Sequence, residues 1–167
     1  NNYFLDFGLL GSKTVPAMLT KYGYIEDAMK MITKTEAPSW GYWVETMGYS
    51  TLPETWTLSP KFADASLNHV FMGDVSAWMM NQLAGINHDD SAPGFRHIRI
   101  TPHFVKELDW AKGEYHSVRG RIASEWKREG DQVMLTVTIP ADCSADIVVG
   151  DQTETVSAGT HTFSYPV

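Results

Sequence analysis

The residues best suited to chemistry lie between residues 38 and 69, a stretch that combines carboxylates, a histidine and indole rings. Glu54 stands close to Trp56, and a carboxylate in such a setting can activate water as a general base or accept a hydrogen bond from a sugar hydroxyl. A solvated loop charge is the alternative interpretation of Glu54. Glu45 is a second and weaker candidate of the same kind.

His69 ends this stretch and begins the clearest helical pattern of the chain. A neutral imidazole donates through one ring nitrogen and accepts through the other, so it can bind a sugar hydroxyl in either sense. The alternative, a histidine that caps a helix and bonds only to backbone, carries equal weight. His69 is therefore a candidate for orienting a sugar or a water molecule.

Three tryptophans of the same stretch offer flat apolar faces: Trp40, Trp43 and Trp56. Aromatic faces among a few carboxylates suit sugars, whose C–H groups stack on rings while their hydroxyls bond to polar groups. Each tryptophan taken alone is more readily explained as core packing. The stretch as a whole has no regular period, and long aperiodic connections are usually functional. We therefore interpret it as a functional loop.

Two short helices are predicted ahead of this loop. Thr14 and Pro16 form a helix-start signal, because proline is tolerated where no N–H partner is needed, and Gly23 is placed to end that helix. Residues 25–32 repeat the helical spacing, with acidic residues in the first turn. A third helix is predicted after the loop from the apolar stripe Leu67, Val70, Phe71, Val75, Trp78, Met79, Leu83 and Ile86.

Beyond a polar, proline-containing linker at 87–94 the apolar period changes from that of a helix to that of a strand. Alternation is clear over residues 118–126 and 133–139, and shorter strands are predicted near residues 98–100, 147–149 and 160–165. Short alternating strands separated by turns are typical of a β-sandwich. The sequence thus predicts a helical part followed by a β part.

The composition excludes several classes of protein. The 167 residues are 43% hydrophobic and 20% charged, which is ordinary for a globular chain, and the net charge of −7 disfavours nucleic acid or an anionic membrane as the main partner. The single cysteine, Cys143, cannot form an internal disulfide, and it is compatible with either the cytoplasm or the periplasm. The absence of a glycine-rich phosphate loop and of metal-ligand spacing predicts neither a cofactor nor a metal.

Several motifs in this order resemble the C-terminal end of bacterial α-L-rhamnosidases of glycoside hydrolase family 78. They are Leu-Leu-Gly at 9–11, Pro-Ser-Trp-Gly-Tyr at 38–42, Ser-Thr-Leu-Pro-Glu-Thr-Trp at 50–56, Ser-Leu-Asn-His at 66–69, Ala-Pro-Gly-Phe at 92–95 and Ile-Pro-Ala at 139–141. The similarity covers nearly the whole chain. Two positions depart from the family's Thr-Thr-(Leu/Ile)-Trp-Glu-x-Trp motif and its surroundings, Pro53 and Thr57, and both bear on which sugar is preferred.

The resemblance implies the last helices of an (α/α)6 catalytic barrel over residues 1–88, a linker over 89–94 and a jelly-roll-like β-sandwich domain over 95–167. It implies an inverting hydrolase that releases terminal α-L-rhamnose, with Glu54 as the general base and His69, Trp56 and Trp40 binding substrate. The general acid belongs to an earlier part of the family's barrel. We therefore expect the chain to be a fragment that is inactive by itself.

The expected partners are a rhamnose-containing glycoside or polysaccharide and the missing N-terminal part of the same enzyme. A partial barrel exposes apolar helix faces, so self-association through them is also predicted. Two other functions remain open: a non-catalytic segment that binds carbohydrate or only braces the protein, and a different (α/α)6-barrel enzyme such as a related glycosidase or a phosphorylase. In the β part, Trp110, Tyr115 or Trp126 would be the sugar-binding rings, although a bracing role is favoured because Trp126 lies on the apolar face of its strand.

Overall fold

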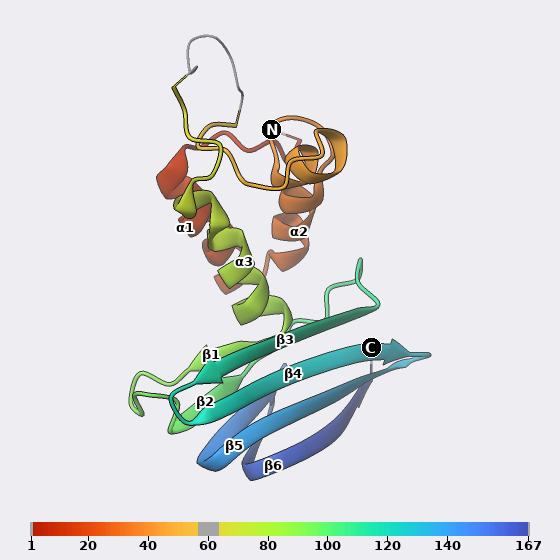
Figure 1. Cartoon of the computed structure of the whole chain (residues 1–167). Coiled ribbons are helices and arrows are strands. Elements are labelled where there is room, and N and C mark those ends of the chain that lie inside the picture. The colour runs from red at the N-terminus through yellow and green to blue at the C-terminus, as the bar shows by residue number, and fades with distance from the viewer. Residues whose placement is uncertain (1, 57–63, 167) are drawn as a thin grey trace. The chain divides into compact units, whose positions relative to one another are not determined.

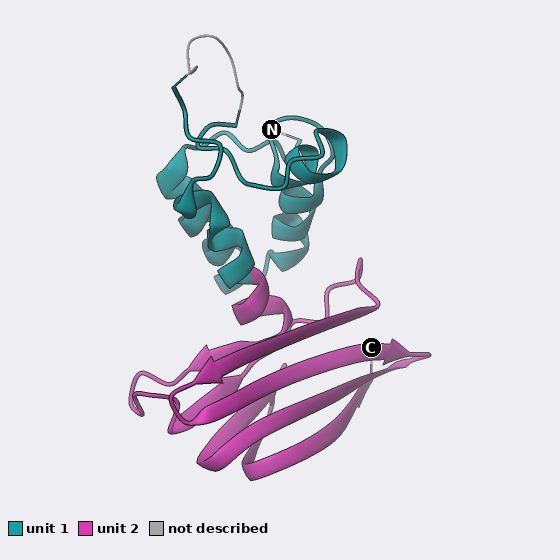
Figure 2. Cartoon of the chain, in the orientation of Figure 1, with its two compact units in different colours: residues 1–78 teal, residues 79–167 magenta. Residues whose placement is uncertain are grey.

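The computed structural model describes residues 2–56 and 64–166. The chain divides into two compact units, residues 1–78 and residues 79–167 (Figure 2). The first unit is helical and the second consists mainly of strands (Figure 1). The predicted order of a helical part and a β part is therefore confirmed. The structure divides the chain into packed units after Trp78. The domain bounds expected from the sequence, at residues 88 and 95, stay a prediction.

The first unit begins with α1 (Leu9–Lys21) and α2 (Ile25–Thr33). The predicted start of α1 near Pro16 is wrong: Pro16 lies inside the helix and is buried, so packing outweighs the backbone hydrogen bond that proline cannot make. The predicted end is confirmed, since Gly23 has a φ of +84° that favours glycine, and its N–H donates to the carbonyl of Thr20 at 3.0 Å.

Polar contacts at the core of the first unit join α1 to the segment after the loop. That segment comprises the short helical turn η3 (Val70–Gly73) and the helix α3 (Asp74–Trp78). The buried Ser12 hydroxyl donates to the carbonyl of Phe71 at 3.1 Å, and the Trp78 indole N–H donates to the hydroxyl of Thr20 at 2.9 Å. Among the described helices, none combines the length and the hydropathy that a bilayer-spanning segment requires.

The third predicted helix ends earlier than its apolar stripe indicates. The helical segment η4 (Met79–Leu83) follows α3, and Ile86 already belongs to the strand β1 (Ile86–His88). Gly85 separates the two with a φ of +78°, and its Cα packs so closely on the backbone of Thr101 and Pro102 that a Cβ would not fit. The first two residues of the linker predicted over 87–94 therefore belong to the strand β1.

The second unit is one six-stranded sheet in the order β1-β2-β5-β4-β3, with β6 also paired to β5. Its further strands are β2 (His97–Ile100), β3 (Trp110–Ser117), β4 (Gly120–Glu129), β5 (Gln132–Val149) and β6 (Gln152–Pro166). The pair β2–β5 is parallel and all other pairs are antiparallel. The strands β1 and β3, at the two ends of this order, also contact each other, so the sheet curls toward closure.

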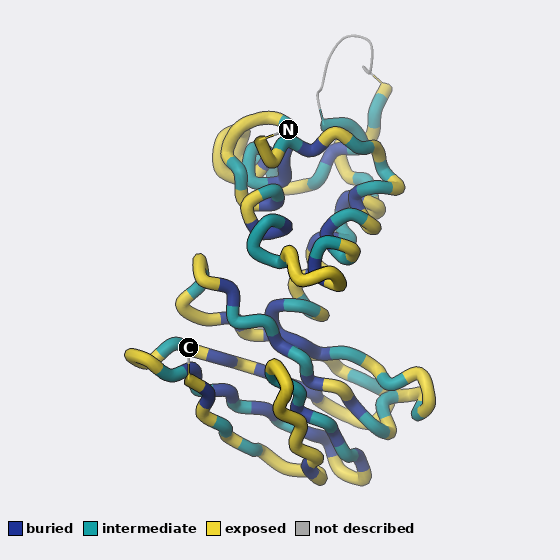
Figure 3. Tube along the Cα trace, turned by 180° about the vertical axis from the view of Figure 1, so that it is seen from behind, coloured by how far each residue is buried: buried dark blue, intermediate teal, exposed yellow. Residues whose placement is uncertain are grey.

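The long strands β5 and β6 hold the two halves of this sheet together. Residues 132–138 of β5 pair with β4, residues 144–147 pair with β2, and a β-bulge lies between them. Buried and half-buried positions alternate along most of β5 (Figure 3). The core comprises Ile98, Ile100, Ile122, Trp126, Val133, Leu135, Val137 and Ile147. This β-rich unit agrees with the predicted sandwich, with the difference that all strands belong to one sheet.

Candidate functional site

Glu54 is held by a two-way contact with one residue across the loop. Its backbone N–H donates to the carbonyl of Ser66 at 2.8 Å, and the Ser66 N–H donates to its carboxylate Oε2 at 3.0 Å. The residue is half-buried, and its contact with Ser66 uses only one of its two carboxylate oxygens. A carboxylate oriented through one oxygen retains a free oxygen that can accept a proton.

His69 lies on the segment that faces the one carrying Glu54. Its backbone N–H donates to the carbonyl of Leu52 at 2.8 Å. This bond and the bond from the Glu54 N–H to Ser66 pair the two segments with each other. The ring Nδ1 of His69 accepts from the N–H of Phe71 at 3.3 Å and caps η3. In the neutral imidazole this bond assigns the proton to Nε2, which leaves a ring N–H donor for a ligand. The structure thus combines the capping role and the capacity to bind.

The three tryptophans of the loop form one cluster. Trp56 stacks on Trp43 with ring centroids 4.7 Å apart and meets Trp40 edge to face at 4.9 Å. Trp40 and Trp43 are only 3% and 1% exposed, whereas Trp56 is half-buried. The Trp40 indole N–H donates to the carbonyl of Met72 at 2.9 Å, and that of Trp56 donates to the carbonyl of Phe7. Trp40 and Trp43 are core residues of this unit, and Trp56 is the one of the three whose side chain is partly accessible.

The other candidates named from the sequence lie in different settings. Glu45 is exposed in the helical turn η1 (Tyr42–Thr46). Pro53 is fully buried beside Glu54. Thr57 lies outside the described residues. Trp126 is fully buried, and its indole N–H donates to the carbonyl of Leu83 at 2.7 Å, which is a core contact within the second unit.

A polar network on the sheet had no counterpart in the sequence reasoning, which assigned His97 no role. His97 Nδ1 lies 2.7 Å from the hydroxyl of Ser144, and its Nε2 lies 3.1 Å from the carboxylate of Asp146. The hydroxyl of Thr155 donates to the same carboxylate at 2.6 Å. Chiefly this hydroxyl, and then His97, hold the pKa of Asp146 below its usual value.

This network joins three strands, because its members pair across β2, β5 and β6. The Ser144 N–H donates to the carbonyl of Arg96 at 3.2 Å and is not free to stabilise an oxyanion, so we assign the network a structural role. In the described ranges, no three histidine, cysteine, aspartate or glutamate side chains gather closely enough to hold a metal ion.

Comparison with known proteins shows that both parts of the chain are similar to domains of bacterial alpha-L-rhamnosidases. The family model described as the bacterial alpha-L-rhamnosidase 6 hairpin glycosidase domain matches residues 1–83. The model described as the bacterial alpha-L-rhamnosidase C-terminal domain matches residues 85–164. An alpha-L-rhamnosidase of Streptomyces avermitilis is 27% identical over 152 residues, which cover 87% of this chain and 14% of that protein.

Two solved structures are similar along nearly the whole chain. The alpha-L-rhamnosidase of Dictyoglumus thermophilum superposes with a TM-score of 0.88 at 26% identity and covers 99% of this chain. That of Aspergillus terreus superposes with a TM-score of 0.91 at 26% identity and covers 98%. The chain spans only 21% and 20% of those two proteins.

Proposed function

We propose that this chain, which belongs to the bacterial alpha-L-rhamnosidase family, supplies the general base of an inverting glycosidase that releases terminal α-L-rhamnose. The resemblance drawn from the sequence motifs is confirmed by the two family models. The pairing that sets Glu54 and His69 on facing segments is the observation that carries the proposal. Because the chain spans 14% of the Streptomyces relative, the activity belongs to a longer protein whose earlier helices complete an (α/α)6 barrel.

In the proposed reaction Glu54 takes a proton from water as the water oxygen bonds to the anomeric carbon. The bond from that carbon to the glycosidic oxygen breaks, and the leaving oxygen receives a proton from a carboxylic acid in the part of the enzyme that precedes this chain. Inverting enzymes keep the two carboxyl groups about 6.5–9.5 Å apart so that water fits between base and sugar. The contact of Ser66 with Oε2 supports this role, since it orients the carboxylate and leaves Oε1 for the water.

The remaining proposed site residues act on the sugar. His69 donates through Nε2 to a sugar hydroxyl, since Nδ1 is engaged by the Phe71 N–H. Trp56 offers its accessible surface to the C–H face of the ring. Trp40, with 3% of its surface exposed, acts through Trp56 by fixing the orientation of that indole.

Replacing one carboxylate tests the proposal in the whole enzyme. Glu54→Gln preserves the size of the side chain and its contact with Ser66 but cannot accept the proton. We expect turnover of an aryl α-L-rhamnoside to fall by about 10²–10⁴-fold, with rhamnose binding retained. Glu45→Gln is the matched control, because Glu45 is an exposed carboxylate of the same loop, and it should leave turnover within about twofold. Nuclear magnetic resonance of the first-formed anomer reports inversion directly.

Equal activity of the Glu54→Gln and wild-type enzymes would refute the proposed base and favour the non-catalytic alternative. The 167-residue chain by itself should release no sugar from the same substrate, because it lacks the acid. Clean turnover by the isolated chain would contradict the assignment of the acid to the preceding part.

A further inference from the structure

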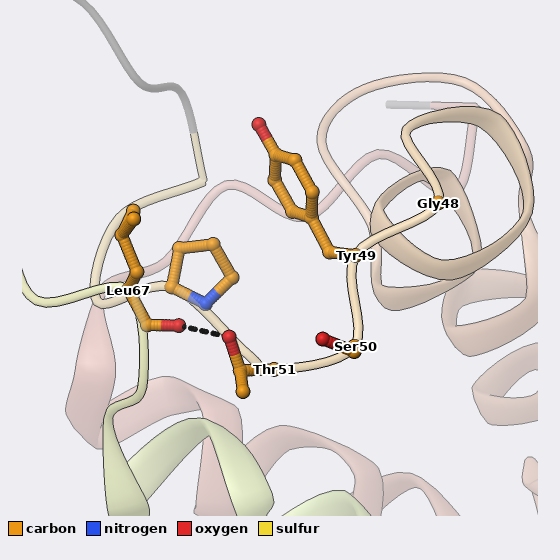
Figure 4. A pocket seen from close by; sticks show the side chains of 6 residues that line it. Gly48, Tyr49, Ser50, Thr51 and Leu67 are labelled. Carbon is orange, nitrogen blue, oxygen red and sulfur yellow. Dashed lines mark hydrogen bonds between the residues drawn. The ribbon is translucent and has the colours of Figure 1, made fainter.

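The two facing segments that carry Glu54 and His69 are tied to each other by hydrogen bonds. The Thr51 hydroxyl donates to the carbonyl of Leu67 at 2.6 Å, and Figure 4 shows these two residues joined by this bond. Together with the backbone bonds described above, it fixes the two segments relative to each other. A different set of contacts anchors them to the helix α1, and these contacts start from residues 7–12.

Ser12 connects the first turn of α1 to the turn that follows His69. Its side chain is buried, with 1% of its surface exposed. Its hydroxyl lies 2.6 Å from the carbonyl oxygen of Leu9 and 3.1 Å from that of Phe71, which is 59 positions away. The N–H of Phe71 donates to His69 Nδ1, and the two rings meet edge to face with centroids 5.3 Å apart. A single residue therefore lies between Ser12 and the imidazole.

The hydroxyl at position 12 is explained by this contact rather than by the helix that contains it. Alanine is the better helix former and carries no polar atom, so a buried helix position by itself favours alanine over serine. The carbonyl of Phe71 also accepts from the N–H of Asp74, which leaves its second lone pair for Ser12. The peptide group after Phe71 is thus held from two sides.

The same stretch of α1 and the residues before it also hold the exposed ring of the site. The indole N–H of Trp56 donates to the carbonyl of Phe7, and the two rings meet edge to face with centroids 5.9 Å apart. Gly11 allows this arrangement, because a Cβ at that position would lie 2.5 Å from the Cβ of Phe7. The glycine of the Leu-Leu-Gly motif therefore has a packing role. Residues 7–12 contact both segments of the site.

We propose that Ser12 is a positioning residue of the site, whose hydroxyl fixes Phe71 so that Phe71 fixes the imidazole of His69. At 1% exposure Ser12 cannot contact a ligand, so its effect reaches the sugar only through these two residues. Without the hydroxyl the imidazole rotates more freely, which weakens sugar binding through Nε2 and leaves proton transfer at Glu54 in place. This inference rests on the proposed function.

Kinetics of the whole enzyme on an aryl α-L-rhamnoside test the proposal. Ser12→Ala should raise KM about fivefold, as the loss of one hydrogen bond predicts, and leave kcat within about twofold. In the His69→Ala background the same change should alter KM by less than about twofold, because the residue through which Ser12 acts is gone. A purely structural role would instead reduce the amount of active enzyme, and with it the apparent kcat, equally in both backgrounds.

Thr20→Ala is the matched control on the same helix. The Thr20 side chain is also buried, and its hydroxyl donates to the carbonyl of Pro16 and accepts from the Trp78 indole, neither of which belongs to the site. The change should lower thermal stability as much as Ser12→Ala does and leave KM unchanged. If Ser12→Ala folds poorly, Ser12→Cys keeps the size of the side chain with a weaker donor and should raise KM by a smaller factor.

Nuclear magnetic resonance of the 167-residue chain gives a measurement that does not depend on catalysis. Exchange of the Phe71 amide proton reports its bond to His69 Nδ1. This exchange should become about fivefold faster in the Ser12→Ala chain and stay unchanged in the Thr20→Ala chain. Equal exchange in the two variants, or equal effects of Ser12→Ala on KM with and without His69, would overturn the proposal.

Failure of the proposed function has a different signature. A His69→Ala enzyme with the KM of the wild type would refute the sugar contact of His69, and turnover of the Glu54→Gln enzyme judges the proposed base. In either case the exchange rate at Phe71 still decides whether Ser12 holds the turn that follows His69.

Discussion

The helical unit and the β unit differ in how completely each covers its own apolar side chains. Of the 14 large hydrophobic residues that are exposed in the described part of the chain, ten lie in residues 1–78 and four in residues 79–167. Tyr22 and Tyr24 are 70% and 57% exposed and line an apolar groove with Met18. The β unit instead buries continuous rows of valine, leucine and isoleucine. We infer that the β unit is self-sufficient, whereas the helical unit requires a further surface to cover it.

The largest effect is expected from opening the core of the β unit. Trp126→Ala removes a fully buried indole and leaves the carbonyl of Leu83 without its donor. We expect a loss of about 3–5 kcal/mol in the free energy of unfolding, measured by urea denaturation. Trp110→Ala is the control, because Trp110 is 62% exposed, and it should cost less than about 0.5 kcal/mol. Equal costs would show that the β unit does not depend on this core.

The uncovered surface of the helical unit should cause self-association. We expect the chain to associate with rising concentration in sedimentation velocity. Tyr22→Lys should weaken that association at least tenfold, because an aromatic side chain buried at an interface contributes about 1.5–3 kcal/mol. Val118→Lys tests the β unit in the same way at a residue that is 90% exposed and should have little effect. A monomer at all concentrations, or equal effects of both variants, would remove the contrast between the units.

A smaller effect is expected from acid on the β unit. The pKa of Asp146 is lowered in the folded chain, first by the Thr155 hydroxyl and then by His97, so its ionised form favours folding. That contribution is fully present above the unfolded-state pKa of about 3.9 and is lost as the pH falls through the lower folded-state value. Asp146→Asn should therefore reduce stability at pH 7 and reduce it less at pH 2, measured by urea denaturation at each pH. Asp151→Asn, at an exposed turn, should behave as wild type at both.

The smallest effect, and one of opposite sign, is expected at Ser124. Its hydroxyl is fully buried and has no hydrogen-bond partner within the described residues. Removing an unsatisfied buried hydroxyl relieves its desolvation cost, so Ser124→Ala should be neutral or stabilise the chain by up to about 1 kcal/mol in thermal unfolding. A clear destabilisation would mean that the hydroxyl has a partner, such as a buried water molecule.

The sequence predicted elements well where local periodicity and packing agree. The helix α2 and the end of α1 at Gly23 follow directly from spacing and a glycine. The strand β3 was missed because its exposed Trp110, Lys112 and Glu114 alternate with Ala111 and Gly113, which are too small to register as an apolar face. The strand β5 was predicted as two strands, because the bulge between Ile139 and Ser144 interrupts its alternation.

The candidate site shows the same limit of local reasoning. Residue type and position were enough to select Glu54 and His69. Their pairing through Leu52 and Ser66 is a contact between distant positions, since Glu54 and Ser66 are 12 positions apart, and no periodic pattern links them. The network around His97 was missed for a similar reason, since its partner Ser144 is 47 positions away.

The parallel pairing of β2 with β5 also constrains the order in which this chain can fold during synthesis. Residues 97–100 of β2 have their partners at residues 144–147 of β5, so β2 leaves the ribosome long before the strand that it pairs with on that side. At typical rates of about 5–20 residues per second this delay lasts several seconds. During that time β2 presents an unpaired edge on that side, and the helical unit, which precedes β2 in the chain, has time to form first.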